Sequence, residues 1–242
     1  MKRNHQRLAY CGVSILVAAA ALAGAEDLTI VSKVTFGKDK ISTSTQYISG
    51  DKIRTSDGSN DTIMEISSGR LTMIDHKKKE YSETSLAEMS AMFDNLNKQM
   101  QGNPILEKMM GSVTDVKVQK GGSSKTVAGY TCDQYLLSMG DNFTFDLWAA
   151  PALQPPYQYY DASKLRYASM GPMGQRFAKM YDEMKKINGM PLSTAIHTKM
   201  MGMSMDTLSE ATEVRKGPIP ASAFDIPAGY KKKDSPFKGK IG

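Results

Sequence analysis

Short runs of alternating apolar and polar residues, separated by turn residues, dominate the chain after residue 26. An alternation with a period of two is typical of a β-strand with one buried face. Turns containing Gly, Ser or Asn join several of these runs, so we expect consecutive strands to pair as antiparallel hairpins. The expected strands are residues 28–36, 45–48, 52–55, 62–66, 70–74, 112–120, 125–128, 130–138, 143–150, 192–200 and 203–215.

Two segments instead repeat apolar residues at three- and four-residue steps, the spacing of an amphipathic helix. The first starts after Ser85, which forms a capping-box pattern with Glu88 three residues later. Its apolar stripe consists of Leu86, Met89, Phe93, Leu96 and Met100. The second starts near residue 173 and ends at Asn188 and Gly189. Its stripe consists of Phe177, Met180, Met184 and Ile187.

The order of these elements predicts an α+β fold. We expect a single curved antiparallel sheet, an incomplete barrel, with two main helices packed on its concave side. No linker rich in Pro or Ser divides residues 26–242, so this segment is expected to form one domain with a basic C-terminal tail.

The first residues have the features of a secretory signal peptide. Lys2, Arg3 and Arg7 precede an uncharged run over residues 11–24, and small residues follow up to Ala25. The run is shorter than the roughly 20 apolar residues of a membrane-spanning helix. We therefore expect residues 1–25 to be cleaved before Glu26 and the protein to be periplasmic or secreted.

Export changes how the charge is interpreted. The chain carries 31 Lys and Arg against 25 Asp and Glu, and loss of residues 1–25 lowers the net charge from +6 to +3. Lysine clusters at 77–79 and 231–233 come with no nucleic-acid-binding motif, so no nucleic-acid partner is expected. Peripheral contact with anionic envelope lipids is the remaining use for these lysines. Cys132 is then a single thiol, expected to be a small core residue.

Catalytic and cofactor motifs are missing from the sequence. Two histidines remain after cleavage, and the lysines beside His76 favour an exposed turn, while His197 lies in an expected strand. The chain has no nucleophile elbow, phosphate-binding loop, dinucleotide glycine pattern or zinc-ligand spacing. We therefore expect a protein that is not an enzyme and holds no cofactor.

Methionine is unusually common, at 18 of 242 residues, and four of these lie in the segment 200–205 as Met200, Met201, Met203 and Met205. On a strand, Met201, Met203 and Met205 would share one face. Three interpretations remain open: an ordinary core, the adaptable wall of an apolar cavity, or a copper(I) site. The copper ligands would come from His197, Met200, Met201, Met203 and Met205. Residues two apart on a strand are separated by roughly 6.5 Å, so such a site would need a bend at Gly202.

Five segments carry a family resemblance: Ile48–Arg54, Met73–Tyr81, Val127–Cys132 followed by Tyr135, Phe143–Trp148 and Phe224–Tyr230. They resemble a family of exported bacterial proteins known as a domain of unknown function, DUF4412. The resemblance implies a fold similar to that of the LolA and LolB lipoprotein carriers, an incomplete antiparallel barrel closed by helices. Such folds hold acyl chains between sheet and helices. The family supplies no established catalytic residues.

The first functional hypothesis is therefore a non-catalytic periplasmic protein that binds a hydrophobic or lipid ligand between sheet and helices. The expected ligand-binding residues are Leu86, Met89, Phe93, Met201, Met203 and Met205. Without a cavity, the same residues would form an ordinary core. The alternatives are a copper(I)-binding protein that uses residues 200–205 and an envelope-associated structural or interaction domain.

Overall fold

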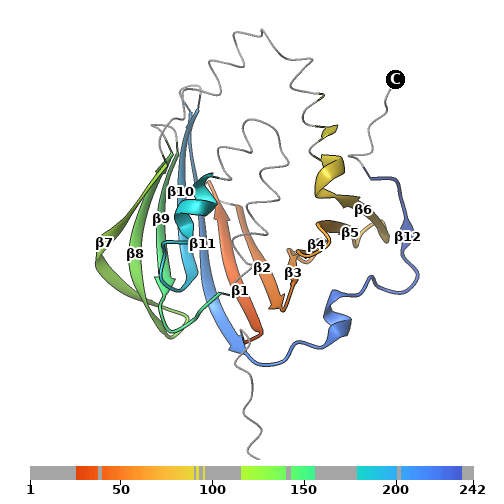
Figure 1. Ribbon diagram of the computed structural model, residues 1–242, viewed down its shortest axis with the longest axis horizontal. Helices are drawn as coiled ribbons and strands as arrows, with labels where there is room; N and C mark the ends of the chain where they lie inside the picture. Colours follow the sequence, from red (N-terminus) through yellow and green to blue (C-terminus); the bar gives the residue numbers. More distant parts are fainter. Residues whose placement is uncertain are drawn as a thin grey trace, which may run out of the picture.

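The computed structural model describes residues 26–37, 40–89, 91–92, 95, 116–139, 143–155, 179–200 and 203–235. Its main feature is one large curved sheet (Figure 1), in the order β12-β6-β5-β4-β3-β2-β1-β11-β10-β9-β8-β7. The strands are β1 (Leu28–Phe36), β2 (Lys40–Ser49), β3 (Lys52–Ser56), β4 (Asn60–Glu65), β5 (Arg70–Asp75), β6 (Glu80–Ser85), β7 (Val116–Val127), β8 (Tyr130–Met139), β9 (Phe143–Ala150), β10 (Met190–Met200), β11 (Met203–Lys216) and β12 (Lys231–Lys232).

The sheet consists of two meanders that meet at one seam. Strands β1–β6 pair each with the next, as do β7–β11, and all these pairs are antiparallel. The seam is the antiparallel pair of β1 and β11, which runs from Leu28 opposite Lys216 to Phe36 opposite Thr207. β12 then adds at the β6 edge as a short parallel strand.

The predicted curved antiparallel sheet is confirmed, and the bounds of β1 and β9 are those expected from the alternation. The runs at 112–120 and 125–128 differ from expectation, because their described residues form one strand, β7. Its register with β8 shifts between Lys120 and Ser124, where the predicted turn is instead a bulge of small residues.

The two main helices expected on the concave side are not confirmed. The described residues include two short helical segments, 86–89 and 179–184, and residues 91, 92 and 95 are also helical, while residues 173–178 and the other residues of 90–100 lie outside the described residues. The start of the first segment is as predicted: the Glu88 N–H donates to Ser85 Oγ (3.1 Å), and the Ser85 N–H donates to Glu88 Oε2 (3.0 Å). Gly189 follows the second at φ +102°, and a Cβ there would lie 2.1 Å from the Ala150 carbonyl oxygen. No other residue fits there.

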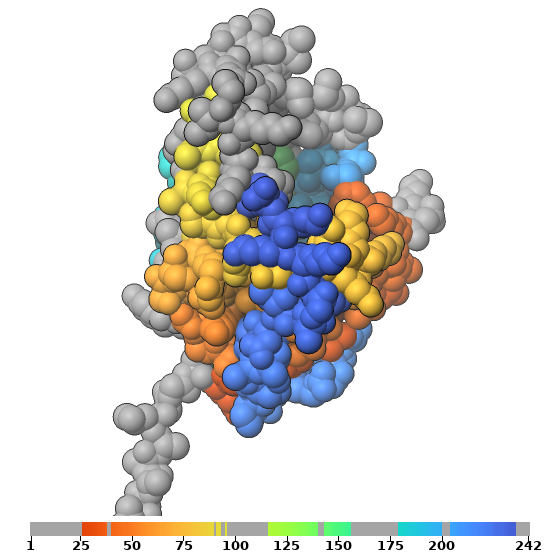
Figure 2. Space-filling model, turned by 90° about the vertical axis from the view of Figure 1, so that its right-hand side faces the viewer, coloured from red at the N-terminus to blue at the C-terminus, as the bar shows by residue number. Residues whose placement is uncertain are grey.

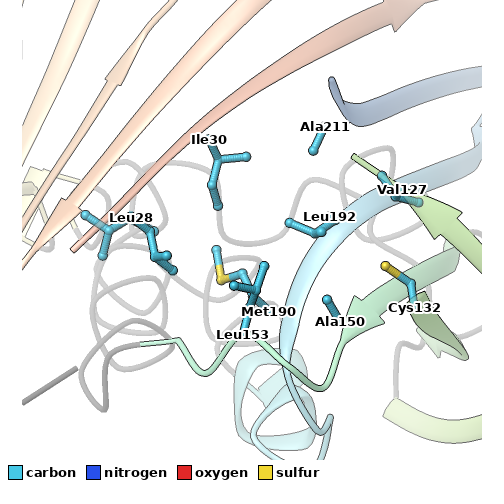
Figure 3. Packing of buried hydrophobic residues seen from close by; sticks show 10 residues of the cluster. Leu28, Ile30, Val127, Cys132, Ala150, Leu153, Met190, Leu192 and Ala211 are labelled. Atoms are coloured by element: carbon cyan, nitrogen blue, oxygen red, sulfur yellow. The ribbon is translucent and has the colours of Figure 1, made fainter. Parts of the chain in front are cut away.

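The two faces of the sheet are covered by different parts of the chain. We call the face that carries segment 179–184 the inner face and the opposite one the outer face. Met180 packs on Leu137 and Phe145 of the inner face. A larger apolar cluster ties β1, β2, β10 and β11 to the β7–β8 hairpin, and Figure 3 shows Val127 and Cys132 of that hairpin beside residues of the neighbouring strands.

The chain after β11 crosses the outer face of the β1–β6 meander. Figure 2 shows this segment, coloured blue, lying across strands coloured orange to yellow. We call residues 217–235 the C-terminal strap. Hydrogen bonds from backbone N–H groups fix it at both ends: the Ile219 N–H donates to the side-chain Oδ2 of Asp27 (2.9 Å), and the Lys231 N–H donates to the Lys79 carbonyl (3.0 Å). The outer-face residues Ile63 and Ile74 are buried.

Candidate functional site

A cavity of about 290 Å³ lies on the inner face. Strands β1–β3 and β8–β11 line it together with segment 179–184. One wall is apolar and well buried, because Leu137 and Phe145 of neighbouring strands pack against Met180 of the helical segment, and Leu147 packs in the adjoining cluster with Met184. Aliphatic, aromatic and thioether side chains give this wall the adaptability of a hydrophobic binding surface.

Polar side chains line the cavity beside this wall, together with Ile30, Leu192 and Ile196. We call its six hydroxyl and amide side chains the polar band: Ser32, Ser44, Gln46, Thr55, Thr194 and Ser209. They form three directly opposed pairs across the sheet: Ser32 with Ser44, Gln46 with Thr55, and Thr194 with Ser209. Thr55 is exposed and the other five members are half-buried, so the band lies on the more open side of the cavity.

The predicted residues of the first helix lie elsewhere. Met89 is buried against Met64 and Leu71, and Leu86 packs on the same cluster. This cluster belongs to β4 and β5, three strands away from the β1–β11 seam. Phe93 lies outside the described residues. Leu86 and Met89 thus belong to a local core and are not among the residues that line the cavity.

The methionine-rich segment spans the β10–β11 turn. Met201 lies outside the described residues, as do the side chains of Met200 and Met203, while Met205 is 43 % exposed. Met205 lies opposite Thr198, whereas His197 lies opposite Asp206. Because neighbouring residues of a strand point to opposite faces, His197 and Met205 do not converge on one ion. The His197 Nδ1 instead lies 2.9 Å from Asp206 Oδ1.

A buried polar cluster on the outer face was not predicted. Arg54 donates to Asp61 Oδ2 and to the carbonyl of Ala223 in the strap. His76 lies between two partners, with Nε2 2.8 Å from Asp61 Oδ2 and Nδ1 2.8 Å from the Tyr230 hydroxyl. The surface turn expected at His76 is confirmed, but the imidazole itself is partly buried and ties the strap to the sheet.

Asp61 is the centre of this cluster, with a side chain that has no exposed surface. Burial alone acts to raise its pKa, but hydrogen bonds from Ser56 and His76 and the charge of Arg54 outweigh it, so the pKa is lowered. The carboxylate is thus held ionised by Ser56, His76 and Arg54. Three of the segments that carry the family resemblance meet here, since Arg54, His76 and Tyr230 belong to separate ones.

A second polar contact holds the β7–β8 hairpin. The Lys125 ammonium donates to Ser193 Oγ (3.0 Å) and Glu210 Oε2 (2.7 Å) and lies 5.0 Å from the centre of the Trp148 ring. The hydrogen bond from Lys125 lowers the pKa of Glu210. Because Ser193 is buried and Lys125 is bound to a carboxylate, this group is built for structure rather than for activating a nucleophile.

Cys132 is completely buried, as expected for a core residue. Burial raises the pKa of its thiol, and a protonated, enclosed thiol is neither a nucleophile nor a metal ligand. Within the described ranges, no three His, Cys, Asp or Glu side chains gather as metal ligands would. Nor do the helical residues described there form a helix long and apolar enough to cross a bilayer.

Comparison with known proteins identifies a family but no activity. The family model described as "Domain of unknown function (DUF4412)" matches residues 25–230. A search of curated proteins finds no significant match.

Several solved structures resemble the fold loosely. An uncharacterised conserved protein from Thermus thermophilus has a TM-score of 0.49 at 6 % identity, covering 87 % of this chain and 91 % of that one. PNGF-II has a TM-score of 0.42 at 12 % identity over 87 % of this chain, which spans only 32 % of PNGF-II. A LolA superfamily protein from Nitrosomonas europaea has a TM-score of 0.29 at 9 % identity, covering 84 % of this chain and 91 % of that one. Similarities with TM-scores below 0.5 do not allow a function to be assigned to this chain.

Proposed function

The chain belongs to the family described as a domain of unknown function, DUF4412, and we propose that it binds a hydrophobic or lipid ligand in its inner-face cavity. The observation that carries the proposal is the cavity of about 290 Å³ between the sheet and segment 179–184, whose lining includes the apolar side chains of Leu137, Phe145 and Met180. The protein would act as a carrier or holder, without chemistry. Its place in the periplasm or outside the cell depends on residues 1–25, which lie outside the described residues.

The size of the cavity sets what can enter. A cavity of about 290 Å³ is nearly twice the roughly 150 Å³ engineered cavity that stays dry and admits benzene. At about 30 Å³ for a water-sized group, it holds roughly ten such groups, or most of a medium-length acyl chain.

The energetics of such a ligand can be bounded. Ten buried methylenes contribute about 8 kcal/mol at about 0.8 kcal/mol each. Association costs at least about 4 kcal/mol in lost freedom of motion. Apolar contacts alone therefore support a Kd of about 1 mM, and tighter binding would require polar contacts as well.

The test is occupancy of the cavity. Purified protein is stripped with organic solvent, exposed to an excess of twelve-carbon amphiphiles and analysed by native mass spectrometry. Ser44→Phe places a large side chain into the cavity, and Thr45→Phe places the same side chain on the opposite face of β2. We expect adducts on the wild type and on Thr45→Phe, and their loss in Ser44→Phe. Absence of any adduct on the wild type, or equal adducts on both variants, would overturn the proposal.

A further inference from the structure

The polar band is unusual because of its place on the sheet. It crosses the middle of the inner face, on β10, β11, β1, β2 and β3, directly beside the apolar wall. Directly opposed residues of antiparallel strands have Cβ atoms about 4.5–5.5 Å apart. Each of the three pairs therefore presents two neighbouring polar side chains to the cavity.

The chemistry of the band is also uniform. Five of its members are hydroxyls and the sixth is the amide of Gln46. Hydroxyls and amides both donate and accept hydrogen bonds, but they supply no counter-charge. A partly enclosed ionic head group would lose water there without gaining an opposite charge, whereas a neutral hydroxyl head would replace its hydrogen bonds to water one for one.

We propose that the polar band recognises the uncharged, hydroxyl-bearing head of a single-chain amphiphile of the monoacylglycerol type. The acyl chain lies against Leu137, Phe145 and Met180, and the glycerol hydroxyls lie at the more open side near Thr55. This orientation matches the exposure of the two sides, because the apolar wall is buried while the band is half-buried to exposed. The inference rests on the proposed function, since it names the ligand class for the same cavity.

The experiment compares two probes with the same acyl chain length. 1-Monolauroylglycerol and laurate are titrated separately into stripped protein at pH 8, below their aggregation concentrations, by isothermal titration calorimetry. We expect the neutral probe to bind about tenfold more tightly, because about one further hydrogen bond is retained. If neither probe binds, the proposed function fails. If both bind equally, or laurate binds better, the cavity is a lipid site but the inference about its head group is wrong.

A pair of variants locates the head group. Thr55→Val removes one hydroxyl of the band, on β3, at nearly constant shape. Thr45→Val makes the same change on the neighbouring strand β2, on the opposite face of the sheet. We expect Thr55→Val to weaken 1-monolauroylglycerol binding about threefold to tenfold and to leave laurate unchanged. Thr45→Val should change neither. Equal effects of Thr55→Val on both probes would show that the band does not read the head group.

Discussion

Removal of the Asp61 carboxylate is the sharpest test of the strap. In Asp61→Ala, the guanidinium of Arg54 and the Nε2 of His76 lose their shared acceptor. Both side chains are mostly buried, with Arg54 18 % exposed and His76 25 % exposed, so water replaces that acceptor only in part. Breaking a buried charge pair by removing one partner costs about 3–5 kcal/mol. Because water still reaches both partners, we place the loss at the lower end, about 3 kcal/mol. For a domain of this size, that corresponds to a Tm lowered by roughly 6–12 °C.

The chain contains a matched control. Asp206 pairs with His197 at 2.9 Å, much as Asp61 pairs with His76 at 2.8 Å, but the Asp206 side chain is 69 % exposed and that of His197 49 %. Exposed pairs contribute about 0–1 kcal/mol. We therefore expect Asp206→Ala to melt within about 3 °C of the wild type at pH 7. Both variants and the wild type would be compared by circular dichroism melting.

The pH dependence gives an independent test of the same reasoning. The folded-state pKa of Asp61 is lowered, so its ionised form stabilises the native state. That contribution is complete above the unfolded-state pKa of about 3.9 and is lost as the pH falls through the lower folded value. The Asp61 contribution to the Tm gap between wild type and Asp61→Ala should therefore be the same from pH 7 to about 4 and should decrease as the pH is lowered further. A gap that does not narrow below about pH 4, or one that Asp206→Ala reproduces at pH 7, would refute the role assigned to the cluster.

Three further predictions concern single side chains. Cys132 should react with a thiol reagent at least about a hundredfold more slowly in the native protein than in denaturant, because the thiol is buried; rapid labelling of folded protein would contradict this. Lys125→Met should return the lowered pKa of Glu210 toward its ordinary value, seen by NMR titration, and cost about 1 kcal/mol, whereas an unchanged titration would show that the ion pair does not form in solution. Glu88→Ala should cost about 1 kcal/mol in denaturant unfolding by removing the cap on Ser85, and Glu88→Gln should retain most of it; equal losses would place the effect elsewhere.

Local patterns predict the strands well, because alternation is a property of neighbouring residues. Leu28–Phe36 and Phe143–Ala150 have the predicted bounds for this reason, and Ser85 marks the start of the first helical segment. The pairing of β1 with β11 joins residues that no hairpin connects, so the alternation carries no sign of that seam. The same holds for the cavity, which draws its lining from both meanders.

The buried polar cluster is harder to predict because its members are far apart in the sequence. His76 and Tyr230 are separated by 154 residues, and the lysines next to His76 indicate only an exposed turn. The local sequence gives one indication of the cluster. Asp61 and Ile63 lie two residues apart on one strand, so the carboxylate is on the same face as a buried isoleucine. A charge at such a position needs partners, but the sequence does not tell which ones.

The strap also determines the order in which the molecule can assemble. Each meander is made of sequence-adjacent hairpins, and such local contacts form early in folding. The seam between β1 and β11 and the contacts of Tyr230 require chain segments that are synthesised last. Until these segments arrive, Ile63 and Ile74 remain exposed on a free sheet face. Partly synthesised chains should therefore depend on a holding chaperone, and release of the C-terminus should be the event that ends this dependence.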